Sequence, residues 1–162
     1  MTHATANANG NPLTIRPATT ADESFLEALA DRLTNFELPR WRTANEIASA
    51  DARAMIASVK AGRRDDEVFV AERARVGVGC LHVIAIEDFF GRPHAHISVI
   101  ATTSAAEGSG IGRALIAYAE RWARDRDLSL LTLNVFAGNT RGRRVYEQAG
   151  FSPEILKYAK CL

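Results

Sequence analysis

Apolar positions in the first third of the chain follow the spacing of helices. A short apolar stretch at 13–17 indicates a strand that Pro17 stops. The next apolar residues recur every three or four positions, at Phe25, Leu26, Leu29 and Leu33. A second helical pattern covers about 45–60 and ends in the glycine-containing run at 61–66. The pattern predicts one strand followed by two helices.

From Val68 onward, apolar residues take the alternating spacing of strands. Segments 68–72, 76–86 and about 95–102 have this spacing, and short polar turns separate them. Because no helix lies between them, the segments predict an antiparallel meander instead of an alternating βαβ array.

The last third of the chain mixes both patterns. A helical pattern runs to about 126, and the nearly all-apolar run at 128–135 is typical of a buried central strand. A helix at 140–149 is closed by Gly150, and 155–162 forms a predicted final strand. We therefore expect a flexible segment at 1–12 and a single domain of mixed α/β class at 13–162.

Composition and charge exclude several classes of protein. The chain has 20 Lys and Arg against 19 Asp and Glu, so no global field attracts nucleic acid or an anionic membrane. No apolar run approaches the roughly 20 residues that span a bilayer, and the first residues lack the apolar core of a signal peptide. We expect a cytoplasmic protein that binds a small molecule.

The two cysteines, Cys80 and Cys161, stand far apart without CxxC spacing or neighbouring ligands. This arrangement predicts reduced packing residues, and neither a disulfide framework nor a metal site.

Glycines at 108, 110 and 112 stand at the start of the third helix. Such a turn exposes backbone N–H groups beside the positive end of a helix dipole, which favours an anionic ligand. The dinucleotide fingerprint fails because Arg113 occupies its third glycine position, and no Gly-Lys pair supplies a P-loop. The motif alone predicts an anion site.

Two linked motifs indicate which anion this site binds. Gly110-x-Gly112, with Arg113 next, resembles the pyrophosphate-binding motif A of the GNAT N-acetyltransferases. Segment 133–141, followed by 145–151 with its Tyr-x-x-x-Gly-Phe pattern, resembles motif B of the same family. The order of elements is also similar, so the resemblance covers about residues 13–162.

The resemblance implies a mostly antiparallel twisted sheet with a splayed strand pair and about four helices. It also implies acetyl-CoA as cosubstrate, no metal, and direct attack by a primary amine of a small molecule or a protein. The alternative is a non-catalytic acyl-CoA sensor or interaction module with the same fold. Analogy with the family allows a homodimer.

By the same resemblance, backbone groups of the glycine turn bind the pyrophosphate and the preceding strand binds the pantetheine arm. The implied cofactor-binding residues are Ile100, Ala101, Thr102, Gly108, Ser109, Gly110, Ile111, Gly112, Arg113, Asn139 and Tyr146. Glu107 stands where the family usually has Gln or Arg, and we expect its side chain to face solvent because it would repel a pyrophosphate.

Tyr146 is the implied general acid. Its reference pKa of about 10 leaves the phenol protonated at neutral pH, so it can supply a proton to a departing thiolate. The alternative is a tyrosine that only packs on the last helix. Asn139 would hydrogen-bond the cofactor or a water, cap the helix beginning near Thr140, or do both.

The general base is not fixed by the resemblance, because no carboxylate stands on the third meander strand. A period of two places His94, His96, Ser98 and Ile100 on one face. His96 is the first candidate base and His94 the second, since an imidazole titrates near neutral pH. His82 is the third, and bulk water is the alternative. Segments 37–41 and 87–90 either form an amine pocket or are plain loops.

Overall fold

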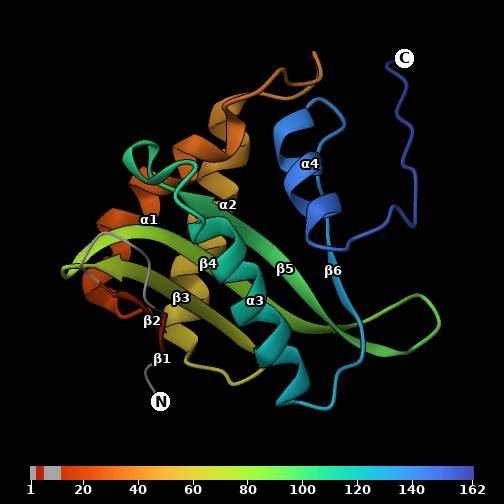
Figure 1. The fold of residues 1–162 in the computed structure, drawn as a ribbon. Coiled ribbons are helices and arrows are strands. Elements are labelled where there is room, and N and C mark those ends of the chain that lie inside the picture. Colours follow the sequence, from red (N-terminus) through yellow and green to blue (C-terminus); the bar gives the residue numbers. More distant parts are fainter. Residues whose placement is uncertain (1–2, 6–11) are drawn as a thin grey trace.

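The structure is a computed structural model that describes residues 3–5 and 12–162. One six-stranded sheet runs through the molecule in the order β1-β2-β3-β4-β5-β6 (Figure 1). The first five strands are antiparallel neighbours, whereas β6 joins β5 in parallel. The strands are β1 (His3–Thr5), β2 (Leu13–Pro17), β3 (Asp66–Arg73), β4 (Val76–Glu87), β5 (Pro93–Thr102) and β6 (Leu131–Leu133).

Helices cover both faces of this sheet. Helices α1 and α2 pack on one face and α3 on the other, while α4 lies beside the β6 end of the sheet (Figure 1). The α-helices are α1 (Glu23–Ala30), α2 (Ala44–Ala61), α3 (Ile111–Arg124) and α4 (Thr140–Gln148). Short 3₁₀ turns are η1 (Thr20–Asp22), η2 (Asp31–Thr34) and η3 (Ser104–Ala106). The predicted mixed α/β class and four helices are confirmed.

Two clusters of buried side chains hold the layers together. Leu81 and Leu115 belong to the cluster under α3, and Leu26, Met55 and Val70 to the cluster under α1 and α2. Each such side chain contributes about 1.5–3 kcal/mol by leaving water. The sheet is therefore fixed on both faces.

A β-bulge interrupts the pairing of β4 with β5. His82 lies opposite Val99 and Val83 opposite Ile97, so Ser98 has no partner residue on β4. The extra residue shifts the alternation of side chains: Ile97 packs under α3 and Val99 under α2. The prediction that His94, His96, Ser98 and Ile100 share one face is therefore wrong, because Ile100 packs on the α3 side, opposite His96.

The apolar run at 128–135 is not a central strand. Only Leu131–Leu133 pairs, and β6 is the outermost strand of the sheet. Leu131 and Leu133 pack partly against the core under α3, whereas Leu130 and Val135 are exposed. Hydrophobicity alone does not distinguish a central strand from an edge strand that packs on a helix.

The predicted final strand at 155–162 is also wrong. This segment has no regular structure and its apolar side chains, Ile155, Leu156, Tyr158 and Leu162, are exposed. It extends on the far side of α4, away from the sheet (Figure 1). A strand needs an edge to pair with as well as an apolar pattern.

Part of the segment predicted to be flexible, 1–12, is described. His3–Thr5 forms β1 and pairs with β2, while residues 1–2 and 6–11 lie outside the described residues. The cysteine prediction holds for Cys80, which is fully buried beside Met55, but Cys161 is exposed and is not a packing residue.

Asp22, at the start of α1, makes folding sensitive to acid. Arg16 donates two hydrogen bonds to its carboxylate at 2.8 Å, and they lower the pKa of Asp22 from 3.8 to about 2. Because the folded pKa is the lower one, this stabilisation is complete above pH 3.8 and is lost as the pH falls toward about 2. We expect Asp22→Asn to flatten the acid dependence of the free energy of unfolding over this range in urea titrations. The exposed Glu27→Gln is the control, and an unchanged slope in Asp22→Asn would contradict the prediction.

Candidate active site

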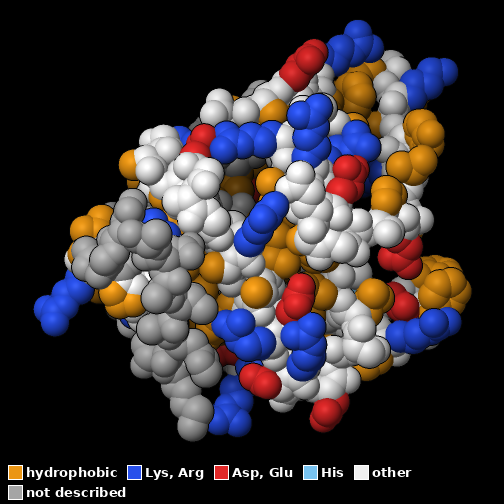
Figure 2. All heavy atoms as spheres, in the orientation of Figure 1, with side chains coloured by type: hydrophobic (Ala, Val, Ile, Leu, Met, Phe, Trp, Pro, Cys, Tyr) orange, Lys and Arg blue, Asp and Glu red, His pale blue; other side chains and the backbone are white. Residues whose placement is uncertain are grey.

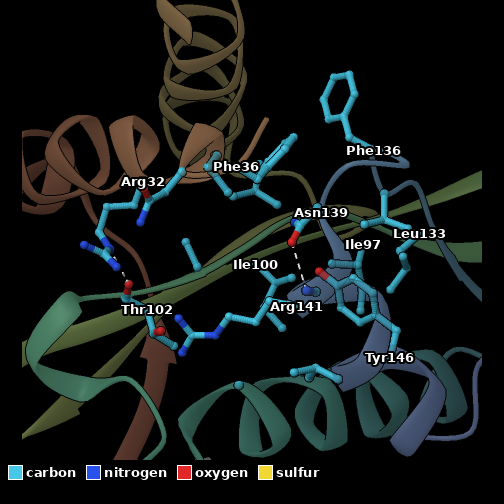
Figure 3. Close-up of a pocket in the computed structure, with 18 of the residues that line it drawn as sticks. Arg32, Phe36, Ile97, Ile100, Thr102, Leu133, Phe136, Asn139, Arg141 and Tyr146 are labelled. Atoms are coloured by element: carbon cyan, nitrogen blue, oxygen red, sulfur yellow. Dashed lines mark hydrogen bonds between the residues drawn. The ribbon is translucent and has the colours of Figure 1, made fainter. Parts of the chain in front are cut away.

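A cleft of about 890 Å³ opens where β5 and β6 diverge. The two strands pair only through Ala95–Ile97 and Leu131–Leu133. Beyond this point, residues 97–102 line one wall and 133–136 another, and the start of α3, α4, η2 and α2 also contribute to the lining (Figure 3). The predicted splayed strand pair is thus present. From Ser98 onward, the edge of β5 that faces β6 has no strand partner in the described chain.

The glycine turn forms the cleft wall at the start of α3. Gly108 and Gly110 have φ of 73° and 82°, a region that side chains with a Cβ rarely adopt. A Cβ on Gly112 would meet nothing within 4 Å, so the first turn of α3 faces open space. Free N–H groups and the positive helix end therefore face the cleft, as an anion requires.

Most of the residues predicted to bind the cofactor line this one cleft. Ser109 does not: its hydroxyl donates a 2.5 Å hydrogen bond to the carbonyl of Ala106 and so supports the turn. The lining residues among them are Ile100, Ala101, Thr102, Gly108, Gly110, Ile111, Gly112, Arg113, Asn139 and Tyr146.

Glu107 is exposed, as predicted, but its carboxylate is also paired with two arginines. Its carboxylate forms ion pairs with Arg32, from η2, and with Arg141, from α4, the latter at 2.6 Å. Arg32 also donates to the carbonyl of Thr102 at 3.0 Å (Figure 3). In Figure 2, a hollow opens between the start of α3 and α4, and charged side chains lie along its rim. The two guanidinium groups offset the repulsion between Glu107 and an anion, and Arg141 lowers the pKa of Glu107.

This arrangement predicts the effect of neutralising Glu107. Glu107→Gln keeps the shape and an acceptor oxygen, but it leaves the charges of Arg32 and Arg141 uncompensated beside the turn. We expect acetyl-CoA to bind several-fold more tightly, with the difference shrinking as salt increases, in isothermal titrations. Weaker binding would show that Glu107 acts mainly by holding the two arginines in place.

Asn139 caps α4 and also lines the cleft. Its side-chain oxygen accepts a 2.9 Å hydrogen bond from the backbone N–H of Gly142. A Cβ on Gly142 would lie 2.8 Å from the Asn139 amide nitrogen, so glycine at this position leaves room for the capping side chain. The cap uses the amide oxygen and leaves the amide NH₂ available to a ligand.

Tyr146 projects from α4 into the cleft, toward β5 and Asn139 (Figure 3). Its ring packs edge-on against Phe151, with centroids 6.0 Å apart. Burial raises the pKa of Tyr146, so the phenol stays protonated at neutral pH. The side chain thus has the protonation state of a general acid.

Comparison with known proteins bears on this site. Residues 26–151 match the model of the acetyltransferase (GNAT) family. The chain belongs to this family. The activity of the family is acetyl-CoA-dependent acetyl transfer. The predicted family, fold and N-acetyltransferase class of this chain are confirmed.

Solved structures resemble this GNAT chain over nearly its whole length. A transcriptional regulator from Bacillus halodurans C-125 is 31% identical, with a TM-score of 0.66 over 91% of this chain and 99% of that one. A putative acetyl transferase from Pyrococcus furiosus has a TM-score of 0.73 at 23% identity, covering 93% and 99% of the two chains. The aminoglycoside N-acetyltransferase AAC(6')-Iy in complex with CoA has a TM-score of 0.70 at 17% identity, covering 96% and 99%. No curated protein sequence matches the chain.

None of the three candidate histidines lines the cleft of this GNAT domain. His82 and His94 are buried, and the ring Nδ1 of His96 lies 2.8 Å from the hydroxyl of Thr132. Burial, with His94 and His82 nearby, lowers the pKa of His96. The geometry gives no support to a histidine as the base.

Of the two loops considered as an amine pocket, 87–90 is not part of the cleft lining, whereas 37–41 borders the cleft between the lining residues Phe36 and Arg42. Phe89 and Phe90 are exposed on the turn between β4 and β5, and residues 37–41 are absent from the cleft lining. Both segments are loops.

One side of the cleft was missed by sequence reasoning. Residues from η2, from α2 and from the loop between them line it: Arg32, Leu33, Asn35, Phe36, Arg42, Glu46, Ile47, Ala50 and Asp51. The signal available in the sequence was Asp51, a carboxylate within the inward-facing stripe of α2 that includes Ala48, Ala52 and Met55.

Within residues 3–5 and 12–162, no three His, Cys, Asp or Glu side chains gather as they do around a metal ion. No helix in the described part of the chain has the length and hydrophobicity to cross a membrane.

Proposed function

We propose that this GNAT domain acetylates a primary amine by direct attack of the amine on acetyl-CoA. The observation that carries the proposal is that the glycine turn, the unpaired edge of β5 and Tyr146 line one cleft. The first two provide sites for the two chemical parts of acetyl-CoA, and the third provides a proton donor at the same place.

The cofactor is expected to bind by backbone groups. The N–H groups at 110–113 suit the pyrophosphate, and Arg32 and Arg141 add positive charge beside them. The free edge of β5 at 100–101 can pair with the amide groups of the pantetheine arm, as a strand would. The NH₂ of Asn139 adds a donor on the opposite wall.

The reaction needs a neutral amine, a polarised carbonyl and a proton for sulfur. The nitrogen lone pair forms the C–N bond at the thioester carbon, and the C–S bond then breaks. The departing thiolate takes the proton of the Tyr146 hydroxyl, and the tyrosinate recovers a proton from the attacking nitrogen. Ser98, which the bulge leaves without a partner on β4, is our candidate for the backbone N–H that polarises the carbonyl.

The function is tested by thiol release from acetyl-CoA across a panel of primary alkylamines, diamines, amino sugars and peptides with free N-termini or lysines. Turnover with at least one amine, with the N-acetyl product identified by mass spectrometry, is expected. Release that does not depend on any amine of the panel would contradict the proposal.

A second candidate is a protein that binds acyl-CoA without turnover. The 31% identical structure is described as a transcriptional regulator, which favours it. Tyr146 in the cleft favours catalysis, because a sensor needs no proton donor there. Saturable acetyl-CoA binding without thiol release for any amine would support the sensor.

A further inference from the structure

We propose that Asp51 receives the ammonium group of the acceptor and takes its proton, so that the acceptor is a cationic primary amine that enters the cleft along α2. This inference rests on the proposed amine acetylation and adds to it a general base and the charge of the substrate.

The other charged groups at this end of the cleft already have partners. Arg42 and Glu46 form an ion pair at 3.1 Å, and Glu46 also bonds to Thr43. Arg32 is held by Glu107 and by the carbonyl of Thr102. Asp51 differs: no hydrogen bond or ion pair joins its carboxylate to any other residue that the structure describes.

Asp51 is half-buried in the inner stripe of α2, next to the buried Ala52 and one turn from Ile47. A carboxylate removed from water without a partner destabilises the fold, unless a bound cation supplies the partner. Burial also raises the pKa of Asp51, which makes its carboxylate a stronger base than an exposed one. An entering ammonium group would meet a base that lacks a partner.

A second unpaired group lies beneath α2. His82 is 4% exposed, and it is on the same face of β4 as Cys80, which packs under α2. Its Nε2 lies 2.8 Å from Asp66, whereas its Nδ1 is buried without a hydrogen-bond partner in the described chain. The charge of protonated His82 favours the carboxylate form of Asp51. His82, which Asp66 holds by its Nε2, therefore acts on Asp51 through its charge and not through a direct contact.

The proton balance is complete with Asp51 included. The ammonium gives one proton to the Asp51 carboxylate, which later releases it to water. The neutral nitrogen attacks the thioester, and its second proton reaches sulfur through Tyr146. The third proton stays on the amide. The products are the N-acetyl amine, CoA with a free thiol, and one proton.

The test compares amines of different basicity in Asp51→Asn. The probes are n-butylamine and 2-phenylethylamine, each paired with its β,β-difluoro analogue, whose ammonium is a much stronger acid. If Asp51 removes the proton, the variant should lose about a hundredfold in kcat/KM with the parent amines, which have a pKa of about 10. The loss should be far smaller with the fluorinated amines, which are largely neutral at pH 7.5 to 8 without help from a base.

Three controls distinguish proton removal by Asp51 from a general effect of charge or of folding. Asp65→Asn removes an exposed carboxylate outside the cleft and should leave all rates unchanged. Asp51→Glu keeps the carboxylate and should restore most of the activity. The acetyl-CoA affinity of Asp51→Asn should equal that of the unsubstituted protein, which also shows that the variant folds.

The outcomes are distinct. Equal losses for parent and fluorinated amines, no loss at all, or no recovery in Asp51→Glu would overturn the role of Asp51 and leave amine acetylation standing. Absence of thiol release with every amine in the unsubstituted protein would overturn the proposed function, and the role of Asp51 with it.

Discussion

Tyr146→Phe is expected to lower kcat about a hundredfold without changing the affinity for acetyl-CoA. The substitution removes only the hydroxyl, so the packing of the ring on Phe151 is kept. Without the phenol, the thiolate must leave unprotonated or take its proton from water. Steady-state thiol release gives kcat, and isothermal titration gives the dissociation constant of acetyl-CoA.

Tyr118→Phe provides the matched control for this prediction. Tyr118 lies on α3, packs against Phe69 with ring centroids 4.7 Å apart, and is not part of the cleft lining. Its substitution should leave kcat unchanged. If Tyr146→Phe is as active as the unsubstituted protein, Tyr146 is only a packing residue of α4.

The double substitution Gly110→Asp and Gly112→Asp is expected to abolish measurable binding of acetyl-CoA. Gly110 has φ of 82°, which an aspartate adopts only with strain. Both substitutions also add a carboxylate to a turn that we expect to bind a pyrophosphate. Together these effects should weaken binding by at least about a hundredfold, equivalent to roughly 2.7 kcal/mol, in isothermal titrations.

Gly62→Asp separates loss of binding from loss of folding. Gly62 ends α2 with φ of 61°, and it lies outside the cleft lining. The Gly62→Asp substitution should cause comparable local strain but leave acetyl-CoA binding unchanged. If the double variant is folded and still binds as tightly as the unsubstituted protein, the pyrophosphate does not lie on this turn.

Features that depend on residues close together in sequence could be predicted well. The glycine turn and Gly150 follow from backbone conformations that their own residue type allows. Tyr146 stands seven residues after Asn139, so one helix carries both into the cleft. Strand β2, both early helices and the meander follow from apolar periodicity.

Features that depend on distant partners could not be predicted. The bulge at Ser98 changes which side chains of β5 share a face, and the residue types around this position do not predict a bulge. Glu107 is paired with Arg32, which lies 75 positions earlier in the chain. The length of β6 depends on where β5 diverges from it, and not on its own hydrophobicity.

Asp51 is a further residue whose proposed role could not be predicted from the sequence. In the sequence it is one of several charged residues in a helix. Its interest comes from partial burial in the cleft and from the lack of a partner among the described residues, which only the packing of α2 over β4 reveals. A carboxylate inside an apolar helical stripe is therefore worth testing as a site residue.

Direct attack by the amine is the central claim, and initial rates measured over a matrix of acetyl-CoA and amine concentrations test it most directly. If both substrates must occupy the cleft together, double-reciprocal plots should intersect, and mass spectrometry should detect no acetylated protein after incubation with acetyl-CoA alone. Parallel lines together with a covalent acetyl-enzyme that an added amine discharges would contradict direct transfer.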